Sequence, residues 1–311
     1  MPDLLPAKRT ICIGECMIEL SERPDGAISR AFGGDTLNTA LYLARLGVPV
    51  DYATALGTDP FSDEMVAAWA GEGIGTELVL RVPDRLPGLY LIRTDTGGER
   101  SFFYWRDSAP VRDMFTLAQA ELVEDAICRA GMVYLSGITL SLFQGSARET
   151  LFHLLARARR AGVRTAFDTN FRSRGWPDRA EAQAAYDRAF ALSDIVLAGM
   201  EDYALLYGGE DPQDAIRRLR DAGVGEAVVK CVHPACHVIT GGVTELVVAD
   251  KVDAVVDTTA AGDSFAAGYL AAIAAGRASP DAARAGHRLA GTVIRFRGAI
   301  IPRHAMPSDI L

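Results

Sequence analysis

The sequence predicts an α/β fold with a central, mainly parallel sheet and a smaller second sheet attached to it. Between residues 132 and 197, apolar runs of strand length alternate with segments of helical periodicity. Such alternation implies parallel strands joined by helical crossovers. Two other stretches, 15–32 and 89–107, contain the paired extended runs that are typical of hairpins. Because 49% of the 311 residues are hydrophobic, we expect one domain spanning residues 1–311.

The composition excludes several classes of partner. A formal net charge of −8 argues against nucleic acid, whose binding depends on clustered Lys and Arg. Neither a signal peptide nor an uninterrupted apolar run of membrane-spanning length is visible, so we expect a cytoplasmic protein without a membrane partner. Five cysteines without a C-x-x-C pair favour reduced thiols in the cytosol.

The first half of the chain reads as two strands and two helices interrupted by the hairpins. Residues 10–13 form the expected first strand, and the first hairpin turns at 24–26. Gly33 and Gly34 lead into a helix with Asp35 or Thr36 as its cap and Gly47 as its end. Further predicted elements are a strand at 51–56, a helix opened by Asp59 and Pro60, a turn at 71–75, and the second hairpin turning at 95–98.

The second half alternates strand and helix and then closes with two helices. We expect strands at 132–135, 164–167, 194–197 and 227–230, helices at 146–161, 179–192 and 280–296, and a hairpin at 237–249 turning at 241–242. Residues 168–174 follow the second of these strands at its carboxyl end, where ligands bind in open α/β sheets.

Residues 257–265 carry the strongest chemical signal. The apolar run 254–256 predicts a strand before them, and helical periodicity begins at Phe265. Ala260, Ala261 and Gly262 leave the first amides of that helix open to an anion, and the helix dipole adds partial positive charge. Asp263 then has two readings of about equal weight. It is either a general base that takes a proton from a substrate hydroxyl or a helix N-cap.

The chain resembles the ribokinase-like, phosphofructokinase-B type sugar kinases, and in particular the branch that acts on 2-keto-3-deoxygluconate. The resemblance lies in residues 257–265 and in the stretches 14–20, 32–39, 86–90, 104–106 and 297–303, in that order along nearly the whole chain. It implies a three-layer ribokinase-like domain in which the two hairpins form a β-sheet lid. It also implies ATP and Mg²⁺ as cofactors and a sugar acid as substrate. The aromatic residues of the second hairpin indicate a surface that pairs with another subunit, so we expect a homo-oligomer, a dimer or larger.

The resemblance also assigns roles to particular residues. Asp263 would be the catalytic base, and the sugar acid would contact Gly34, Asp35, Asn38, Tyr90, Tyr104, Arg106, Arg172 and Asp263. ATP and its anion hole would involve Asn170, Arg172, Lys230, Ala260, Ala261, Gly262 and Asp263. Asp257 and Thr259 would join a monovalent-cation site. For Asp35 and Asn38, the alternative is an ordinary helix cap.

Two stretches depart from the family pattern. Residues 231–237, where the resembling kinases have a glycine-containing loop, hold Cys231, His233, Cys236 and His237; we favour a rigid proline-containing loop over a zinc site, because the spacing matches no standard one. At residues 199–202, Gly199 replaces an Asn that often contributes to the magnesium shell. Asp202 could still bind Mg²⁺ through water.

The leading functional hypothesis is ATP-dependent phosphorylation of 2-keto-3-deoxygluconate to 2-keto-3-deoxy-6-phosphogluconate. Arg106 and Arg172 would flank one pocket, where guanidinium groups suit a carboxylate; alternatively, Arg172 serves the ATP phosphates and Arg106 makes a surface ion pair. Two rival functions remain. One is a kinase of the same fold acting on a neutral sugar such as fructose or ribose, and the other is a catalytically silent sugar-binding regulator. The presence of Asp263 counts against the silent regulator.

Overall fold

The computed structural model describes residues 8–22, 26–94 and 100–311. Within these ranges the main sheet has nine strands in the order β13-β12-β11-β10-β9-β8-β1-β4-β5. Its strands are β1 (Thr10–Ile13), β4 (Val50–Gly57), β5 (Val79–Val82), β8 (Met132–Ser136), β9 (Arg164–Asp168), β10 (Ile195–Gly199), β11 (Glu226–Lys230), β12 (Ala235–Thr240) and β13 (Val243–Val248). All pair in parallel except β12, which is antiparallel to both β11 and β13.

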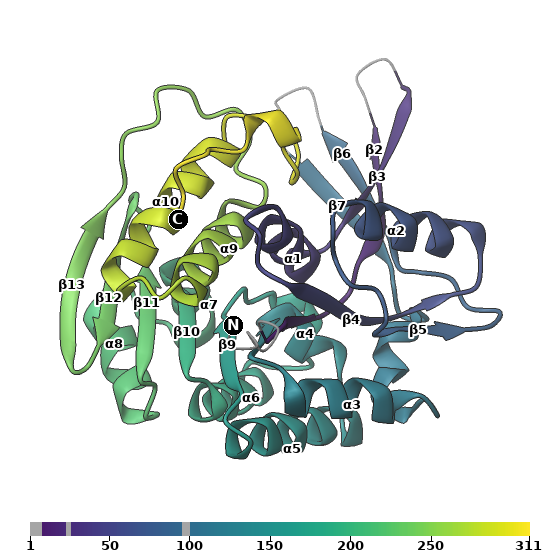
Figure 1. Cartoon of the computed structure of the whole chain (residues 1–311), viewed down its shortest axis with the longest axis horizontal. Helices are drawn as coiled ribbons and strands as arrows, with labels where there is room; N and C mark the ends of the chain where they lie inside the picture. Colours follow the sequence, from purple (N-terminus) through teal and green to yellow (C-terminus); the bar gives the residue numbers. More distant parts are fainter. Residues whose placement is uncertain (1–7, 23–25, 95–99) are drawn as a thin grey trace, which may run out of the picture.

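Helices cover both faces of this sheet, which gives three layers (Figure 1). One core lies under α1 (Asp35–Arg45), α2 (Pro60–Gly71), α9 (Ala261–Ala274) and α10 (Ser279–Val293). The other lies under α3 (Ala120–Arg129), α4 (Gly137–Leu142), α5 (Ser146–Arg160), α6 (Arg179–Leu192), α7 (Met200–Tyr207) and α8 (Pro212–Asp221). Successive residues of a strand pack into opposite cores. In β11, for example, Val228 packs into the core under α9 and Val229 into the core on the other face of the sheet.

The helices α9 and α10 cross closely because glycines face each other's backbone. A Cβ on Gly268 would lie 2.9 Å from the Ala285 carbonyl oxygen, and one on Gly286 would lie 2.8 Å from that of Phe265. Just past α10, the Ile294 carbonyl accepts hydrogen bonds from the amides of Val256 and Asp257, at 2.8 and 3.1 Å. The loop that leads into α9 is therefore held by the end of α10.

A four-stranded second sheet in the described chain stands beside the layered body (Figure 1). Its strands are β2 (Met17–Glu22), β3 (Ile28–Gly33), β6 (Leu89–Thr94) and β7 (Arg100–Trp105). The pairs β2–β3 and β6–β7 are antiparallel hairpins, and β2 and β6 join them in parallel. The two predicted hairpins are thus confirmed as one small sheet. The turns predicted at 24–26 and 95–98 lie wholly or mostly outside the described residues.

Most predicted elements are present, and two local predictions are wrong. Residues 254–256 form no strand: Val255 and Val256 are exposed, and the loop bonds to Ile294 rather than to a sheet neighbour. The N-cap of α1 is Gly34, and no side chain caps this helix. By contrast, the Asp59 carboxylate accepts from the amides of Phe61 and Ser62 at the start of α2, as predicted.

Several elements had no counterpart in the predictions, namely β5, α3, α4, α7 and α8. Searching the described residues for a helix both long and apolar enough to cross a bilayer finds none.

Candidate active site

The site lies where the carboxyl ends of the parallel strands meet the first turns of α1 and α9. Because parallel strands end at one edge, Gly14 after β1, Asp168 at the end of β9 and Lys230 at the end of β11 all lie along it. The helices α1 and α9 bring Asn38 and Asp263 to the same edge. Residues that are distant in sequence are therefore assembled by the topology.

Asp263 is the third residue of α9 and does not cap the helix. The cap position belongs to Ala260, whose left-handed backbone (φ 60°, ψ 17°) opens the turn, and no side chain bonds to the helix amides there. The Asp263 carboxylate instead accepts a 2.8 Å hydrogen bond from Asn38 Nδ2. Thr39 Oγ1 donates to the Asp263 carbonyl at 3.2 Å, which fastens α9 to α1. Of the two readings, this geometry leaves the carboxylate available for proton transfer.

The surroundings of Asp263 favour its protonated form. Desolvation, followed by the negative charge of Asp35, raises the pKa of Asp263 to about 8, while the Asn38 hydrogen bond and the charge of Lys230 act in the opposite direction. A carboxylate with such a pKa is a stronger base than an ordinary one, which suits proton abstraction from a hydroxyl.

The first turn of α9 has the open space that an anion needs. Apart from its chain neighbours and its own helix backbone, a Cβ placed on Gly262 would meet only one atom of the described residues within 4 Å, Lys230 Nζ at 3.9 Å. Lys230 Nζ in turn bonds to both carboxylate oxygens of Asp168, at 3.1 and 3.3 Å. A cation therefore lies beside the exposed helix start, which together with the helix dipole makes a cradle for a phosphate-like group.

Asn170 lies at the end of β9 in a conformation that few side chains adopt, with φ 27°. Its Nδ2 donates a 2.8 Å hydrogen bond to the Asp35 carboxylate at the start of α1. Asp35 is the first residue of α1, after the cap position at Gly34, and its carboxylate bonds to Asn170 rather than to the amides of its own helix. This bond joins Asn170 to Asp35, a predicted sugar contact, whereas the sequence analysis assigned Asn170 to ATP.

Asp202 and Arg172 form a second acidic and basic pair on the same edge. Asp202 accepts from Thr169 Oγ1 at 2.9 Å and pairs with Arg172 at 3.4 Å, and the Arg172 side chain is 60% exposed. A Cβ on Gly199 would lie 3.1 Å from the Asp202 carboxylate, so the departure from the family pattern at Gly199 leaves room for that group. Exposed pairs of this length contribute little stability, so a ligand could replace Asp202 as the partner of Arg172.

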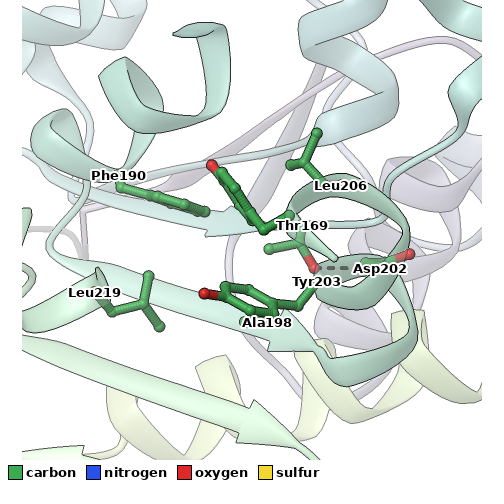
Figure 2. Close-up of a pocket in the computed structure, with 8 residues that line it drawn as sticks. Thr169, Phe190, Ala198, Asp202, Tyr203, Leu206 and Leu219 are labelled. Carbon is green, nitrogen blue, oxygen red and sulfur yellow. Dashed lines mark hydrogen bonds between the residues drawn. The ribbon is translucent and has the colours of Figure 1, made fainter. Parts of the chain in front are cut away.

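A small cavity of about 10 Å³ lies behind Asp202, lined mainly by apolar groups between α6, α7 and α8 (Figure 2). The Thr169–Asp202 hydrogen bond closes its polar side. Its size is about that of one water molecule, which is too small for a sugar or a nucleotide. We therefore assign it no ligand.

The residues predicted on the lid form a second group. Tyr90 donates a short hydrogen bond to Glu19, and the Tyr90 and Tyr104 rings lie 5.8 Å apart. Arg106, just after β7, forms an ion pair with Glu15, whose side chain is only 3% exposed. The alternative of a surface ion pair for Arg106 is therefore wrong, because its partner is buried. Among the described residues, no hydrogen bond or ion pair joins this group directly to Asp263.

The two other predicted or considered metal sites, at Asp257 and Thr259 and in the 231–237 loop, lie in loops with several internal hydrogen bonds. Asp257 Oδ1 accepts from the amide and hydroxyl of Thr259, and its Oδ2 accepts from the Gly298 amide at 3.0 Å. In the 231–237 loop, hydrogen bonds from Cys231 to Ala235 and from Ala235 to His233 make a tight turn. A search of the described residues finds no group of three or more His, Cys, Asp or Glu placed to hold a metal ion.

Sequence reasoning gave no role to three carboxylates of this region, Glu15, Glu19 and Asp168, although Asp168 lies in the stretch 168–174 that it placed at the ligand edge. Glu15 and Asp168 stand at carboxyl ends of central strands, so the rule that drew attention to residues 168–174 could also have identified Glu15. Glu19 is found only from its bond to Tyr90, which depends on the pairing of β2 with β6.

Comparison with known proteins agrees with this architecture. The profile of the pfkB family of carbohydrate kinases matches residues 7–306. The chain is 45% identical to a 2-dehydro-3-deoxygluconokinase of Escherichia coli K12 (97% of this chain, all of the relative) and 44% identical to one of Dickeya dadantii (98% and 100%). A crystal structure of a fructokinase with bound ATP from Xylella fastidiosa superimposes with a TM-score of 0.84 at 25% identity, covering 97% of each chain.

The family match spans nearly the whole chain, and the fold and the cradle beside Asp263 agree with it. The protein belongs to the pfkB family of carbohydrate kinases. Its fold is ribokinase-like, as the sequence indicated, with a large mostly parallel sheet and a small second sheet.

The raised pKa of Asp263 yields a test of the site. Because a base must be deprotonated to act, we expect kcat/KM for sugar phosphorylation to rise with pH, with a midpoint near 8, and to level off at higher pH. The Asn38 bond lowers this pKa, so Asn38→Leu should move the midpoint upward. Steady-state kinetics across this pH range measure both effects. An unchanged midpoint in Asn38→Leu would contradict the hydrogen bond between Asn38 and Asp263.

Proposed function

We propose that this protein is a cytoplasmic kinase that transfers the γ-phosphoryl group of ATP to 2-keto-3-deoxygluconate and produces 2-keto-3-deoxy-6-phosphogluconate. The single observation that carries the proposal is the Asp263 carboxylate, held by Asn38 beside the open helix start. The substrate is supported by the two relatives of 44 and 45% identity, both named for 2-dehydro-3-deoxygluconate, which is the same compound. Five free cysteines, three of them buried, support a reducing compartment.

In the proposed reaction the terminal hydroxyl of the sugar acid lies next to Asp263, which accepts its proton as the oxygen attacks the γ-phosphorus. The bond from that phosphorus to the bridging oxygen of ADP breaks in line. Amides of the residues 260–263 turn and the Lys230 ammonium stabilise the charge on the transferred group. Most of the catalysis in this scheme comes from position and electrostatics.

The sugar acid would lie between the start of α1 and the small sheet. Gly34, Asp35 and Asn38 would face its hydroxyls, and Tyr90 and Tyr104 its carbon chain. Arg106 would bind the carboxylate, since a guanidinium presents donors in the geometry of two carboxylate oxygens. Arg172, exposed and weakly paired, could serve either this carboxylate or the ATP phosphates.

We propose Mg²⁺ and ATP as the cofactors, with Asp202 facing the metal through water, because Mg²⁺ keeps much of its hydration in such sites. Bound Mg²⁺ would neutralise charge on the phosphates. The fructokinase that this chain resembles was crystallised with ATP. We further propose a monovalent cation near Asp257 and Thr259, whose carboxylate and hydroxyl lie together before α9. Activity compared in potassium and tetramethylammonium buffers tests the cation.

The proposed base can be tested by an isosteric change. Asp263→Asn retains the shape and can still accept the Asn38 hydrogen bond, so we expect normal folding and ligand binding with turnover reduced about a hundredfold or more. ATP consumption is measured over 2-keto-3-deoxygluconate, fructose and ribose. Near-normal turnover in the variant would remove Asp263 from catalysis, and equal use of the neutral sugars would refute the substrate.

Recognition of the carboxylate should reside in Arg106. We expect Arg106→Ala to weaken binding of the sugar acid by about 1.5–3 kcal/mol, the scale of a hydrogen bond to a charged group, and to leave ATP binding nearly unchanged. Calorimetric titration with each ligand separates the two effects. Weaker ATP binding with unaltered sugar-acid binding would show that Arg106 contacts ATP, and the assignment of Arg106 to the carboxylate would be wrong.

We also propose that the small sheet, formed by residues 15–32 and 89–107, is a lid that closes over the sugar and excludes competing water. Its exposed aromatic residues Phe102, Phe103, Tyr104 and Trp105 support a second role as a contact between subunits, in a dimer or larger oligomer. Hydrogen exchange should show ligand-dependent protection in β2 and β6, and sedimentation velocity should show more than a monomer. Unprotected hairpins or a monomer would contradict the respective role.

A further inference from the structure

Glu15 is a buried acidic residue to which the proposed reaction gives no role. It follows Gly14 at the carboxyl end of β1, just before β2 begins, and its side chain is 3% exposed. Its carboxylate forms an ion pair with Arg106, whose side chain is 20% exposed. The pair thus links the start of the first lid hairpin to the end of the second.

This ion pair is incompletely hydrogen-bonded. Glu15 Oε2 contacts Arg106 Nη2, whereas within the described part of the chain Glu15 Oε1 and Arg106 Nε have no hydrogen-bond partner. Burial raises the pKa of Glu15, and the charges of Arg106 and Arg112 only oppose that effect. Desolvation can cost such a pair more than its attraction returns, so a buried pair with an unfilled donor and acceptor is weak evidence for a stabilising role. A ligand that completes its hydrogen bonds would account for it.

The surrounding backbone is shaped to fit Glu15. A Cβ on Gly88 would lie 2.8 Å from its Oε1 and 3.1 Å from the Arg106 Cβ, so a larger residue there would press on the pair. A Cβ on Gly34 would lie 2.2 Å from the Glu15 carbonyl oxygen. Since Gly34 begins α1, Glu15 is fixed between the proposed sugar site and Arg106.

We propose that Glu15 is a positioning residue that holds the Arg106 guanidinium toward the substrate carboxylate, and so makes the enzyme select a sugar acid over a neutral sugar. This inference rests on the proposed function. An arginine fixed before binding loses less side-chain freedom when it engages a carboxylate with both branches of its fork. Among the described residues Arg106 has no second carboxylate partner, so only Glu15 can fix it by charge.

The negative charge of Glu15 also repels an incoming carboxylate, and the two effects have opposite signs. The orienting effect of Glu15 on Arg106 outweighs its repulsion of the ligand. Without Glu15, the long Arg106 side chain would turn its guanidinium toward water, which it already reaches in part. Loss of Glu15 would therefore remove Arg106 from the site and would not strengthen its attraction for the ligand.

The test compares Glu15→Gln with a matched control, Glu64→Gln, which removes the exposed ion pair between α2 and Arg30 of the lid strand β3. Each variant is assayed with 2-keto-3-deoxygluconate and with its neutral carboxamide as a competitive inhibitor. For Glu15→Gln we expect the KM of the acid to rise about thirtyfold or more, the lower end of the scale for losing one partner of a buried charge pair. The KM for ATP, the Ki of the amide and the control variant should stay near wild type.

A double variant separates positioning from a structural role. If Glu15 acts through Arg106, Glu15→Gln combined with Arg106→Ala should lose no more acid affinity than Arg106→Ala alone. Glu15→Asp retains the charge but is one methylene shorter, so it should lose selectivity for the acid as well. If circular dichroism shows that Glu15→Gln does not fold, Glu15→Asp replaces it in the test.

The outcomes distinguish this inference from the function on which it rests. Equal losses for acid and amide, additive losses in the double variant, or tighter binding of the acid would overturn the role of Glu15. If Arg106→Ala itself leaves the KM of the acid unchanged, the carboxylate assignment in the proposed function fails instead.

Discussion

The contact between α1 and α9 is the constraint on which the site depends. Asn38 and Thr39, on consecutive positions of α1, bond to the side chain and the backbone of Asp263 respectively. The helix α1 begins after Gly34, and α9 begins at the open turn of residues 260–263. Because two hydrogen bonds fix these helix starts relative to each other, the distance between the proposed acceptor hydroxyl and phosphoryl group would be set by rigid elements rather than by loops.

The charges of the site are arranged in pairs that balance locally. Asp168 lies against Lys230, Asp202 against Arg172 and Glu15 against Arg106, while Asp35 and Asp263 are each held by an asparagine amide. An amide donates a hydrogen bond without cancelling the negative charge, which is consistent with a pKa of Asp263 that stays raised despite its bond from Asn38. The acids farther out are neutralised by cations that phosphate or carboxylate ligands can also engage.

Much of this arrangement could be predicted from local sequence, and the failures at the site and in the loop before it share one cause. The strands, the hairpins and the helix after Gly262 follow from periodicity and turn residues. The role of Asp263 could not be settled locally, because its partner Asn38 is 225 positions away in the sequence. Asp35 looked like a cap because its bond to Asn170 arises only in the folded chain. Residues 254–256 looked like a strand because their bonds to Ile294 are likewise tertiary.

The close crossing of α9 and α10 has a consequence for how this site can change over time. At Gly268 and Gly286 the helices leave no room for even a methyl group. The Ile294 carbonyl, just beyond α10, accepts hydrogen bonds from the loop that leads into α9. Displacing α10 would therefore also displace the turn that we propose binds phosphate. We therefore expect substitutions in α9 and α10 to be poorly tolerated, although beyond the first turn of α9 these helices contribute none of the proposed catalytic side chains. Variation in specificity is better accommodated at the opposite end of the molecule, in the small sheet, where side chains can be exchanged without shifting the reacting groups.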